Sequence, residues 1–374
     1  MKLFTKLILT CSVIGCLTLI SSCGEDDNPG GDNQFSRDDM LKNLGNNLII
    51  PSYESLLASL QQLQTSIQAF NANPTTGTLS TSRDDFQDAY LKWQRSSFYE
   101  FGRAENVLLR ASMNSFPTNT ITINSNISSG NYNLDAVANI NAAGLPAIDY
   151  LLNGLADNDQ DLLAFYTSDS NAANRKTYLE DLAETMISKV SDVLDNWKAS
   201  GGNYIQTFIN ANGTDIGSSL GILVNTITLH YEKFTRDNKI GIPLGVRSLG
   251  IPVPANVEAR YSEQSIALAT ENLKAIRDFY LGKGAEDGLG IYDNLKALDA
   301  KNGDALLADV ISDQLDLVIS KVSDIPEPYA ETVENNPDPA NAAYQELQKL
   351  VILFKTDMSS ALGVLITYQD NDGD

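Results

Sequence analysis

Histidine and cysteine are nearly missing from this sequence of 374 residues. His230 is the single histidine, and the three cysteines, Cys11, Cys16 and Cys23, all precede residue 24. A zinc site built from several histidines is therefore excluded. Cleavage before Cys23 would leave one cysteine in the mature chain, so we expect no disulfide bond and a fold stabilised by packing alone.

Basic residues and long apolar runs are also scarce. The chain has 26 Lys and Arg residues against 48 Asp and Glu residues, which gives a formal net charge of -22. An acidic surface repels phosphate, and no basic cluster with interleaved aromatic residues is present, so we expect no nucleic-acid partner. After residue 23 no run approaches the ~20 apolar residues of a membrane-spanning helix. The mature chain is therefore predicted to be soluble.

The N-terminus has the pattern of a bacterial lipoprotein signal. Lys2 and Lys6 precede an apolar stretch over residues 7–20, and two serines precede Cys23. This order indicates a signal peptide over residues 1–22. The small residues before Cys23 resemble a lipobox, in which the cysteine becomes the lipidated first residue. We expect an outer-membrane lipoprotein with a lipid anchor at Cys23.

Residues 23–36 read as an acidic, Gly-rich linker. Gly24-Glu25-Asp26-Asp27 comes directly after the predicted anchor, and Pro, Gly and Asn follow it. The acidic run resembles the surface-export signal of lipoproteins in Bacteroidetes-type bacteria, which predicts a protein exposed at the cell surface. An ordinary solvated spacer on a periplasm-facing protein is the alternative.

Apolar residues recur at steps of three and four through most of the chain, which indicates amphipathic helices. The clearest run is Tyr53, Leu56, Leu57, Leu60, Leu63, Ile67 and Phe70. Similar runs contain Trp93, Trp197 and Phe354, and alternating strand patterns are rare. The segment from Ser115 to Asn133 is rich in Asn, Ser, Thr and Gly, which predicts a long irregular loop.

These patterns predict an all-α fold of two fused helical bundles. The double glycine Gly201-Gly202 places the boundary, which gives an N-terminal bundle over 37–200 and a C-terminal bundle over 201–374. A short match between residues 187–193 (ISKVSDV) and 319–325 (ISKVSDI) leaves an internal duplication open.

The run from Gly144 to Gly154 has the signals of a helix start. Glycine followed by Pro146 suits a helix entrance with the proline at N1, where its missing N–H has no partner to lose. Asp149 would then lie in the first turn, where the helix dipole favours a carboxylate. The apolar residues around it recur at helical spacing and would face a core.

His230 lies on a helical pattern with Leu223, Ile227 and Phe234. No Gly-x-Ser-x-Gly elbow accompanies it, so a structural histidine is favoured over a catalytic one. A metal site would have to use oxygen ligands, which suit calcium, magnesium or iron(III). Residues 157–161 begin like a calcium loop but lack the glycine and glutamate that such a loop requires.

Five blocks, in the same order along the chain, resemble the imelysin-like family. They are the aromatic block Tyr90–Gly102, Phe116–Asn119 (Trp-Pro-x-Asn in the family), Gly144–Gly154 (Gly-x-His-x-x-Glu), Lys239–Gly245 (Lys-x-Gly-x-Pro) and Val257–Ser262 (Glu-x-x-Tyr/Phe-Ser). The resemblance covers residues 37–366. In the third block Pro146 stands in place of the family's histidine, and Asp149 in place of its glutamate.

The resemblance implies two helical bundles with a cleft between them. The candidates for lining that cleft are Asp149, Glu258, Ser262, Glu100 and Tyr261. Asp149 is the one metal-ligand candidate kept from the motif, and a helix cap or structural hydrogen bond is the alternative for each residue. Glu258, for example, could simply begin a helix after the prolines that precede it.

Two activities are associated with the family: peptidase action and iron-regulated uptake at the cell envelope. A zinc peptidase needs about three protein ligands and a water, so the missing histidine argues against an enzyme. We expect a non-enzymatic binding component linked to uptake of iron or an iron complex, with iron or another oxygen-ligated cation as its cofactor and outer-membrane transport proteins as partners. A metallopeptidase and a surface adhesion or scaffold protein are the alternatives.

Overall fold

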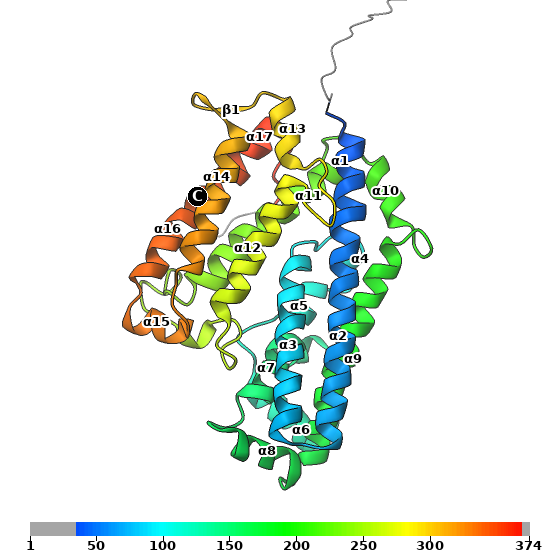
Figure 1. The fold of residues 1–374 in the computed structure, drawn as a ribbon, viewed down its shortest axis with the longest axis vertical. Helices are drawn as coiled ribbons and strands as arrows, with labels where there is room; N and C mark the ends of the chain where they lie inside the picture. The colour runs from blue at the N-terminus through cyan, green and yellow to red at the C-terminus, as the bar shows by residue number, and fades with distance from the viewer. Residues whose placement is uncertain (1–34, 369–374) are drawn as a thin grey trace, which may run out of the picture. The chain divides into compact units, whose positions relative to one another are not determined.

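Helices make up nearly all of the regular structure in the computed structural model, which describes residues 35–368 (Figure 1). The all-α prediction is confirmed, and the strands in this part of the chain form one small antiparallel hairpin of β1 (Lys301–Asn302) and β2 (Ala305–Leu306). The predicted signal peptide, Cys23 and the acidic run after it lie outside the described residues.

Three long helices, α2, α3 and α9, pack side by side in the first part of the chain (Figure 1). The elements here are α1 (Arg37–Asn43), η1 (Leu44–Ile49), α2 (Ile50–Ala72), α3 (Thr76–Ser96), α4 (Arg103–Asn106), α5 (Leu109–Met113), α6 (Thr120–Ser129), η2 (Val137–Ala142), α7 (Gly144–Asn153), α8 (Asp159–Thr167) and α9 (Ala172–Trp197). The apolar run predicted from Tyr53 to Phe70 forms α2, and its core-facing side chains, Leu60 and Leu63 among them, are fully buried.

A second group of helices, α12, α14 and α16, packs together in the later part of the chain, and α12 also packs against α3 (Figure 1). The elements are α10 (Tyr204–Asn210), α11 (Ser219–Leu229), η3 (His230–Gly241), η4 (Pro254–Asn256), α12 (Ser265–Leu281), α13 (Ile291–Ala297), α14 (Leu307–Ser323), α15 (Tyr329–Asn335), α16 (Asp338–Ile352), η5 (Leu353–Met358) and α17 (Ser359–Leu362). Gly201-Gly202 lies in the turn between α9 and α10, and the domain boundary there stays a prediction. Within residues 35–368, no helix is both long and apolar enough to span a membrane.

The loop predicted from Ser115 to Asn133 is wrong in its centre, where α6 forms. The side chain of Asn119 accepts a hydrogen bond from the backbone N–H of Thr122 at 3.0 Å and caps the helix. Ile123 and Ile127, four residues apart, are the buried face. Most other positions of α6 hold polar residues, so the composition of this segment is typical of a loop.

The start of α7 differs in detail from the prediction. The helix begins at Gly144, so Pro146 is its third residue and Asp149 lies in the second turn. Gly144 has φ 72°, and a Cβ there would lie 2.6 Å from the carbonyl oxygen of Ser112 and would also meet that of Met113. Only glycine combines this backbone conformation with so close an approach. Pro146 is tolerated because N–H groups in the first turn have no partner within the helix.

The segment predicted as one helix through His230 changes type at that residue. α11 ends at Leu229, and the chain continues directly as the π-helix η3. A π-helix makes i→i+5 hydrogen bonds and has a wider turn than an α-helix. In η3 this turn brings His230, Phe234, Asn238 and Lys239 to the wall of one cavity.

Candidate ligand-binding site

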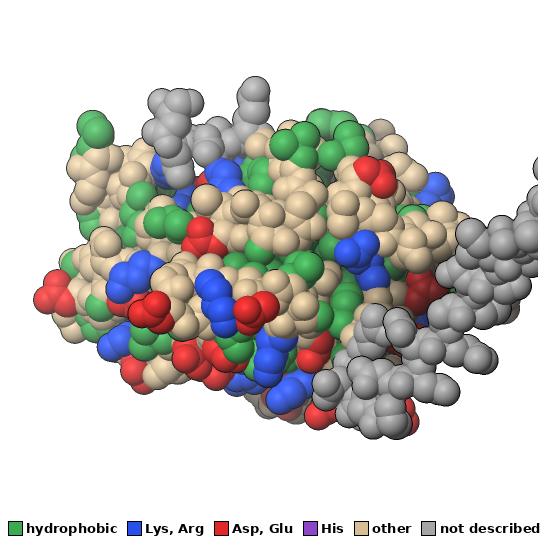
Figure 2. Space-filling view, turned by 90° about the horizontal axis from the view of Figure 1, so that it is seen from above, with side chains coloured by type: hydrophobic (Ala, Val, Ile, Leu, Met, Phe, Trp, Pro, Cys, Tyr) green, Lys and Arg blue, Asp and Glu red, His purple; other side chains and the backbone are tan. Residues whose placement is uncertain are grey.

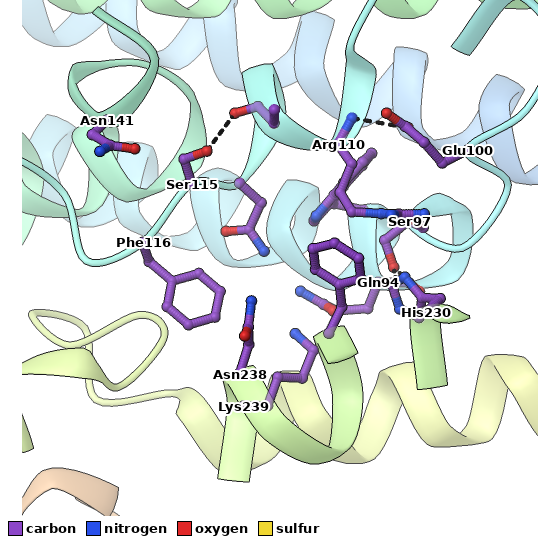
Figure 3. Close-up of a pocket in the computed structure, with 14 residues that line it drawn as sticks. Gln94, Ser97, Glu100, Arg110, Ser115, Phe116, Asn141, His230, Asn238 and Lys239 are labelled. Atoms are coloured by element: carbon purple, nitrogen blue, oxygen red, sulfur yellow. Dashed lines mark hydrogen bonds between the residues drawn. The ribbon is translucent and has the colours of Figure 1, made fainter. Parts of the chain in front are cut away.

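A cavity of about 290 Å³, here called cavity A, lies between η3 and the part of the chain that runs from α3 to the loop after α5 (Figure 3). It is lined by Trp93, Gln94, Ser97, Glu100, Arg110, Ala111, Asn114, Ser115, Phe116, Asn141, His230, Phe234, Asn238 and Lys239. These residues come from both sides of the predicted boundary at Gly201-Gly202. Most of them are polar, which is unusual for a space walled by buried helices.

Glu258 is the centre of a buried polar cluster beside cavity A. Its side chain is fully buried, and the ammonium group of Lys239 forms an ion pair with its Oε2 atom. Its Oε1 atom accepts hydrogen bonds from Gln94 Nε2 at 3.1 Å and from Asn114 Nδ2 at 2.7 Å. Because three donors surround the carboxylate, its burial costs far less than burial of an unpaired charge.

Tyr90 extends this cluster away from the cavity. Its hydroxyl donates a hydrogen bond to Asn114 Oδ1 at 2.6 Å. Burial, together with the nearby Glu258 and Asp149, raises the pKa of Tyr90 well above its usual value, so this hydroxyl stays protonated. The donation fixes the orientation of the Asn114 amide, whose Nδ2 then donates to Glu258. Burial lowers the pKa of Lys239, whereas Glu258 raises it.

Glu100 and Arg110 place a second pair of opposite charges in the wall of cavity A (Figure 3). Glu100 Oε2 accepts the backbone N–H of Arg110 at 3.0 Å, and burial raises the pKa of Glu100 to about 7. Arg110 Nε donates to the Ser97 carbonyl at 3.1 Å, and the guanidinium lies 4.2 Å from the centroid of the Phe234 ring. At pH 7 a permanent cation therefore lies near a carboxyl group that is about half protonated.

His230 begins η3 and is 2% exposed. Its Nε2 atom lies 3.3 Å from Asn272 Oδ1, and Asn272 in turn donates through Nδ2 to the Gln94 carbonyl at 3.0 Å. Because that donation fixes the amide, Oδ1 is an acceptor and the ring proton is on Nε2. Burial and the charges of Arg110 and Lys239 lower the pKa of His230 well below its usual value, so the ring is neutral.

A second space of about 240 Å³, cavity B, adjoins the motif helix α7. It is lined by Phe116, Pro117, Thr118, Thr120, Pro146, Asp149, Ala255, Val257, Ala259, Arg260 and Tyr261. Phe116 lines both cavities, so its ring lies in the wall between them.

Asp149 fastens α7 to the turn that follows η4. Its Oδ2 atom accepts the backbone N–H of Tyr261 at 2.9 Å, and its Oδ1 atom accepts from Asn153 Nδ2 at 3.2 Å. Burial raises the pKa of Asp149 to about 6, and these hydrogen bonds and Ser262 oppose the shift. Residue 259 of the same turn is an alanine with φ 48°, a conformation that costs an L-residue roughly 1–2 kcal/mol. The carboxylate therefore acts as a structural clamp on a strained turn.

The motif position does not fit a metal ion. Both oxygens of Asp149 are already engaged by N–H donors, and Pro146 has no side-chain ligand. No group of three or more His, Cys, Asp or Glu side chains within residues 35–368 is placed to hold a metal. Cavity A instead combines two cations with amides, an indole and an imidazole.

The five residues predicted to line one cleft are divided between these places. Glu100 is in the wall of cavity A, and Asp149 and Tyr261 line cavity B. Glu258 is buried behind the donors that line cavity A, and Ser262 lies beside Asp149.

Sequence reasoning missed Arg110, Gln94, Asn114 and Asn238. The one signal for Arg110 was its position as a lone charged residue in the apolar stretch Val107-Leu108-Leu109-Arg110-Ala111. The three amides stand in ordinary polar surroundings in the sequence and gave no signal.

The helices and cavity A define a class of protein: all-helical, with a buried polar binding site between elements that lie far apart in the sequence. The chain belongs to the imelysin family, also designated peptidase M75, whose sequence profile matches residues 49–354. Over 103 residues it is 25% identical to the iron-regulated protein A of Synechococcus elongatus. That match spans 28% of this chain and 27% of that protein.

Two crystal structures share the fold. One is a Parabacteroides distasonis protein described as an iron-regulated protein A precursor, with a TM-score of 0.68 and 15% identity. The other is an imelysin-like protein from Psychrobacter arcticum, with a TM-score of 0.67 and 17% identity. Each match covers 89% of this chain and 97% of the other chain. At such identities the likeness establishes the fold alone.

Proposed function

We propose that this chain is an outer-membrane lipoprotein, anchored at Cys23, that binds a ligand in cavity A without converting it and takes part in uptake of iron or an iron complex. The lipoprotein part is supported by the order of charged, apolar and small residues before Cys23. The link to iron is supported by the names of two relatives, both of which are described as iron-regulated.

Cavity A carries the proposal, because it combines charged groups with buried polar atoms that have no partner. Trp93 Nε1, Gln94 Oε1, Arg110 Nη2 and His230 Nδ1 are all buried and without a hydrogen-bond partner among the described residues. An unsatisfied buried polar atom costs about 1–3 kcal/mol. Four such atoms, all on residues that line one cavity, favour a space that is occupied when the protein works.

The same residues support binding rather than catalysis. Ser97 has a hydroxyl close to His230, with its Oγ atom 3.5 Å from Nε2. That hydroxyl donates to the Gln94 carbonyl at 3.2 Å and accepts from Asn272 Nδ2 at 3.0 Å. A nucleophilic serine must donate to its base, so Ser97 lacks the necessary arrangement. The peptidase alternative is weakened further because Pro146 stands where the family's motif has histidine.

A retention experiment tests the binding function. The purified chain from residue 24 onward is dialysed against radiolabelled iron(III) citrate, and we expect close to one iron complex retained per chain. In cells grown on iron(III) citrate, deletion should lower iron accumulation, and the wild-type gene should restore it. A Cys23→Ala variant should restore it poorly, because the protein is no longer anchored. Absence of retention together with unchanged accumulation would refute the proposal.

Two further measurements address the enzyme alternative and the location. Digestion of a peptide library by the purified chain should yield no cleavage, and cleavage that Asp149→Ala abolishes would establish the peptidase instead. Treatment of intact cells with proteinase should degrade a surface-exposed protein. Full protection would place it on the periplasmic side.

A further inference from the structure

The residues that line cavity A carry buried polar atoms without a partner among the described residues, and these atoms are of two kinds, each of which specifies part of a ligand. Trp93 Nε1 and Arg110 Nη2 are donors, whereas Gln94 Oε1 and His230 Nδ1 are acceptors. His230 Nδ1 is an acceptor because the ring proton is on Nε2, which faces Asn272 Oδ1. A ligand that satisfies both kinds must itself carry an acceptor group and a separate O–H or N–H donor.

The donors point to an anionic acceptor group. Arg110 Nη2 belongs to a planar guanidinium, whose geometry suits a carboxylate or another oxyanion. Glu258 offsets the charge of Lys239, whereas Glu100 offsets that of Arg110 only in part, because its pKa is about 7. Cavity A therefore has a positive excess at neutral pH, inside a chain whose formal net charge is -22.

This excess is a property of the interior. On the face seen in Figure 2, acidic and basic side chains are interspersed, and no large basic patch covers it. The Arg110 side chain, by contrast, is half-buried, with its guanidinium over the Phe234 ring, where a charge interacts more strongly with a ligand than it would at the surface.

The volume limits the ligand to a small molecule. Cavity A measures about 290 Å³, close to the lower end of the range of about 300–1,000 Å³ that pockets for small molecules cover. Asn141 is exposed and Phe116 is half-buried, so these two residues form the outer edge of the cavity. A small molecule fills this space, whereas a peptide chain or a polysaccharide would extend beyond its outer edge.

We infer that cavity A binds a small hydroxycarboxylate, with its carboxylate on Arg110 and Trp93 and its hydroxyl on Gln94 or His230. The inference rests on the proposed binding function and adds the chemical class of the ligand. It also gives a physical reason for the link to iron, because hydroxycarboxylates supply the oxygen ligands that suit iron(III).

Matched pairs of acids that differ by one hydroxyl test the class. Isothermal titration of the purified chain is performed with lactate against propionate, malate against succinate, and citrate against tricarballylate, all free of iron. Inorganic phosphate tests the other oxyanion source. We expect at least one hydroxy acid to bind, and to bind at least tenfold tighter than its partner without the hydroxyl, because its absence leaves a buried acceptor unpaired.

Two variants test the residues. Trp93→Phe keeps an aromatic ring but removes the indole N–H, and Arg110→Gln removes the charge; each should weaken hydroxy-acid binding at least tenfold. The matched control is Arg103→Gln, which removes an arginine that pairs with Asp192 outside cavity A, and affinity should not change. Circular dichroism establishes that each variant is folded. If Arg110→Gln does not fold, Trp93→Phe alone decides.

The outcomes separate this inference from the proposed function. Hydroxy acids that bind while iron(III) citrate is not retained would support the ligand class and remove the link to iron. Retained iron(III) citrate whose binding is unchanged in Trp93→Phe and Arg110→Gln would overturn the inference and leave a binding protein with its site elsewhere. Equal affinity within every pair, binding of phosphate alone, or no binding of any acid would also overturn it.

Discussion

Cavities A and B share the ring of Phe116 but differ in how their polar groups are satisfied. In cavity B, the motif residue Asp149 has hydrogen bonds on both oxygens, from a backbone N–H and from its helix neighbour Asn153. In cavity A, polar atoms of four lining residues have no partner among the described residues. The satisfied region has the properties of structural support, and the unsatisfied region has those of a binding site.

The family motif and the proposed binding site therefore lie at different cavities of the same chain. The most informative sequence block, Gly144–Gly154, supplies α7 and a clamp for the turn at Tyr261. The residues suited to hold a ligand come from blocks with weaker signals, at Gln94, Arg110 and His230.

The largest effect is expected where both regions depend on one position. Gly144 starts α7 with φ 72° and packs against the carbonyl oxygens of Ser112 and Met113 beside cavity A. Gly144→Ala should lower the free energy of unfolding by about 4 kcal/mol or prevent folding, because strain and a clash with backbone combine.

Gly250→Ala is the control for that substitution. Gly250 has φ 80° and no atom within 4 Å of an added Cβ, so only the conformational cost of about 1 kcal/mol applies. Urea denaturation of the purified chain measures both. Equal losses in the two variants would show that the contact with α5 is unimportant.

The second largest effect is the difference in stability lost when a buried ion pair and a partly exposed ion pair are each broken. Lys239→Met leaves Glu258 buried without its cation and should cost about 3–5 kcal/mol of unfolding free energy. Lys198→Met breaks the partly exposed pair with Glu54 and should cost about 0–1 kcal/mol. Adding Glu258→Gln to Lys239→Met should recover part of the loss. A small cost for Lys239→Met would mean that the pair contributes little to the fold.

The smallest effect is a difference in pH dependence between the two regions. The pKa of Asp149 is raised to about 6 and that of Glu100 to about 7, so each folded carboxyl holds a proton that the unfolded chain has released. The bound protons therefore stabilise the folded chain, and this stabilisation is complete at low pH. It is lost as the pH rises from about 4 to 6 for Asp149 and from about 4.5 to 7 for Glu100.

Replacement of each carboxyl group by the matching amide tests the pH range over which that carboxyl group affects stability. Asp149→Asn should reduce the fall in unfolding free energy between about pH 4 and 6. Glu100→Gln should reduce the fall between about pH 4.5 and 7. Each reduction should be roughly 1–2 kcal/mol after allowance for partial solvent screening. Denaturation midpoints at several pH values measure the slopes. Parallel curves for wild type and both variants would show that neither carboxyl has a shifted pKa.

Much of the fold could be predicted from the sequence, because apolar residues recur every three or four positions along a long helix that has one buried face. The run from Tyr53 to Phe70 became α2 without change. α6 was missed because its buried face consists of Ile123 and Ile127 alone, among residues typical of loops. η3 was missed because an apolar pattern at steps of three and four indicates an α-helix and contains no sign of a wider turn.

The site was harder to predict than the fold. Glu100 and Glu258 came from the family blocks, but their surroundings depend on tertiary contacts between positions as distant as Gln94 and Glu258. Local sequence does not encode which donors will face a carboxylate across such a separation. For the same reason, the missing partners of Trp93 Nε1 and Arg110 Nη2 appear only when the walls of cavity A are assembled.

The π-helix η3 has a consequence for how this chain tolerates length changes. Each i→i+5 turn takes up one more residue than an α-turn over about the same stretch of axis. Loss of a single residue between His230 and Gly241 would let one wide turn relax into an α-turn, and the side chains before and after that turn would keep nearly their present directions. Loss of a residue from the α-helix α11 would instead rotate every side chain after it by about a quarter turn around the axis. The wide turns therefore make this segment more tolerant of a one-residue deletion than the α-helix that precedes it.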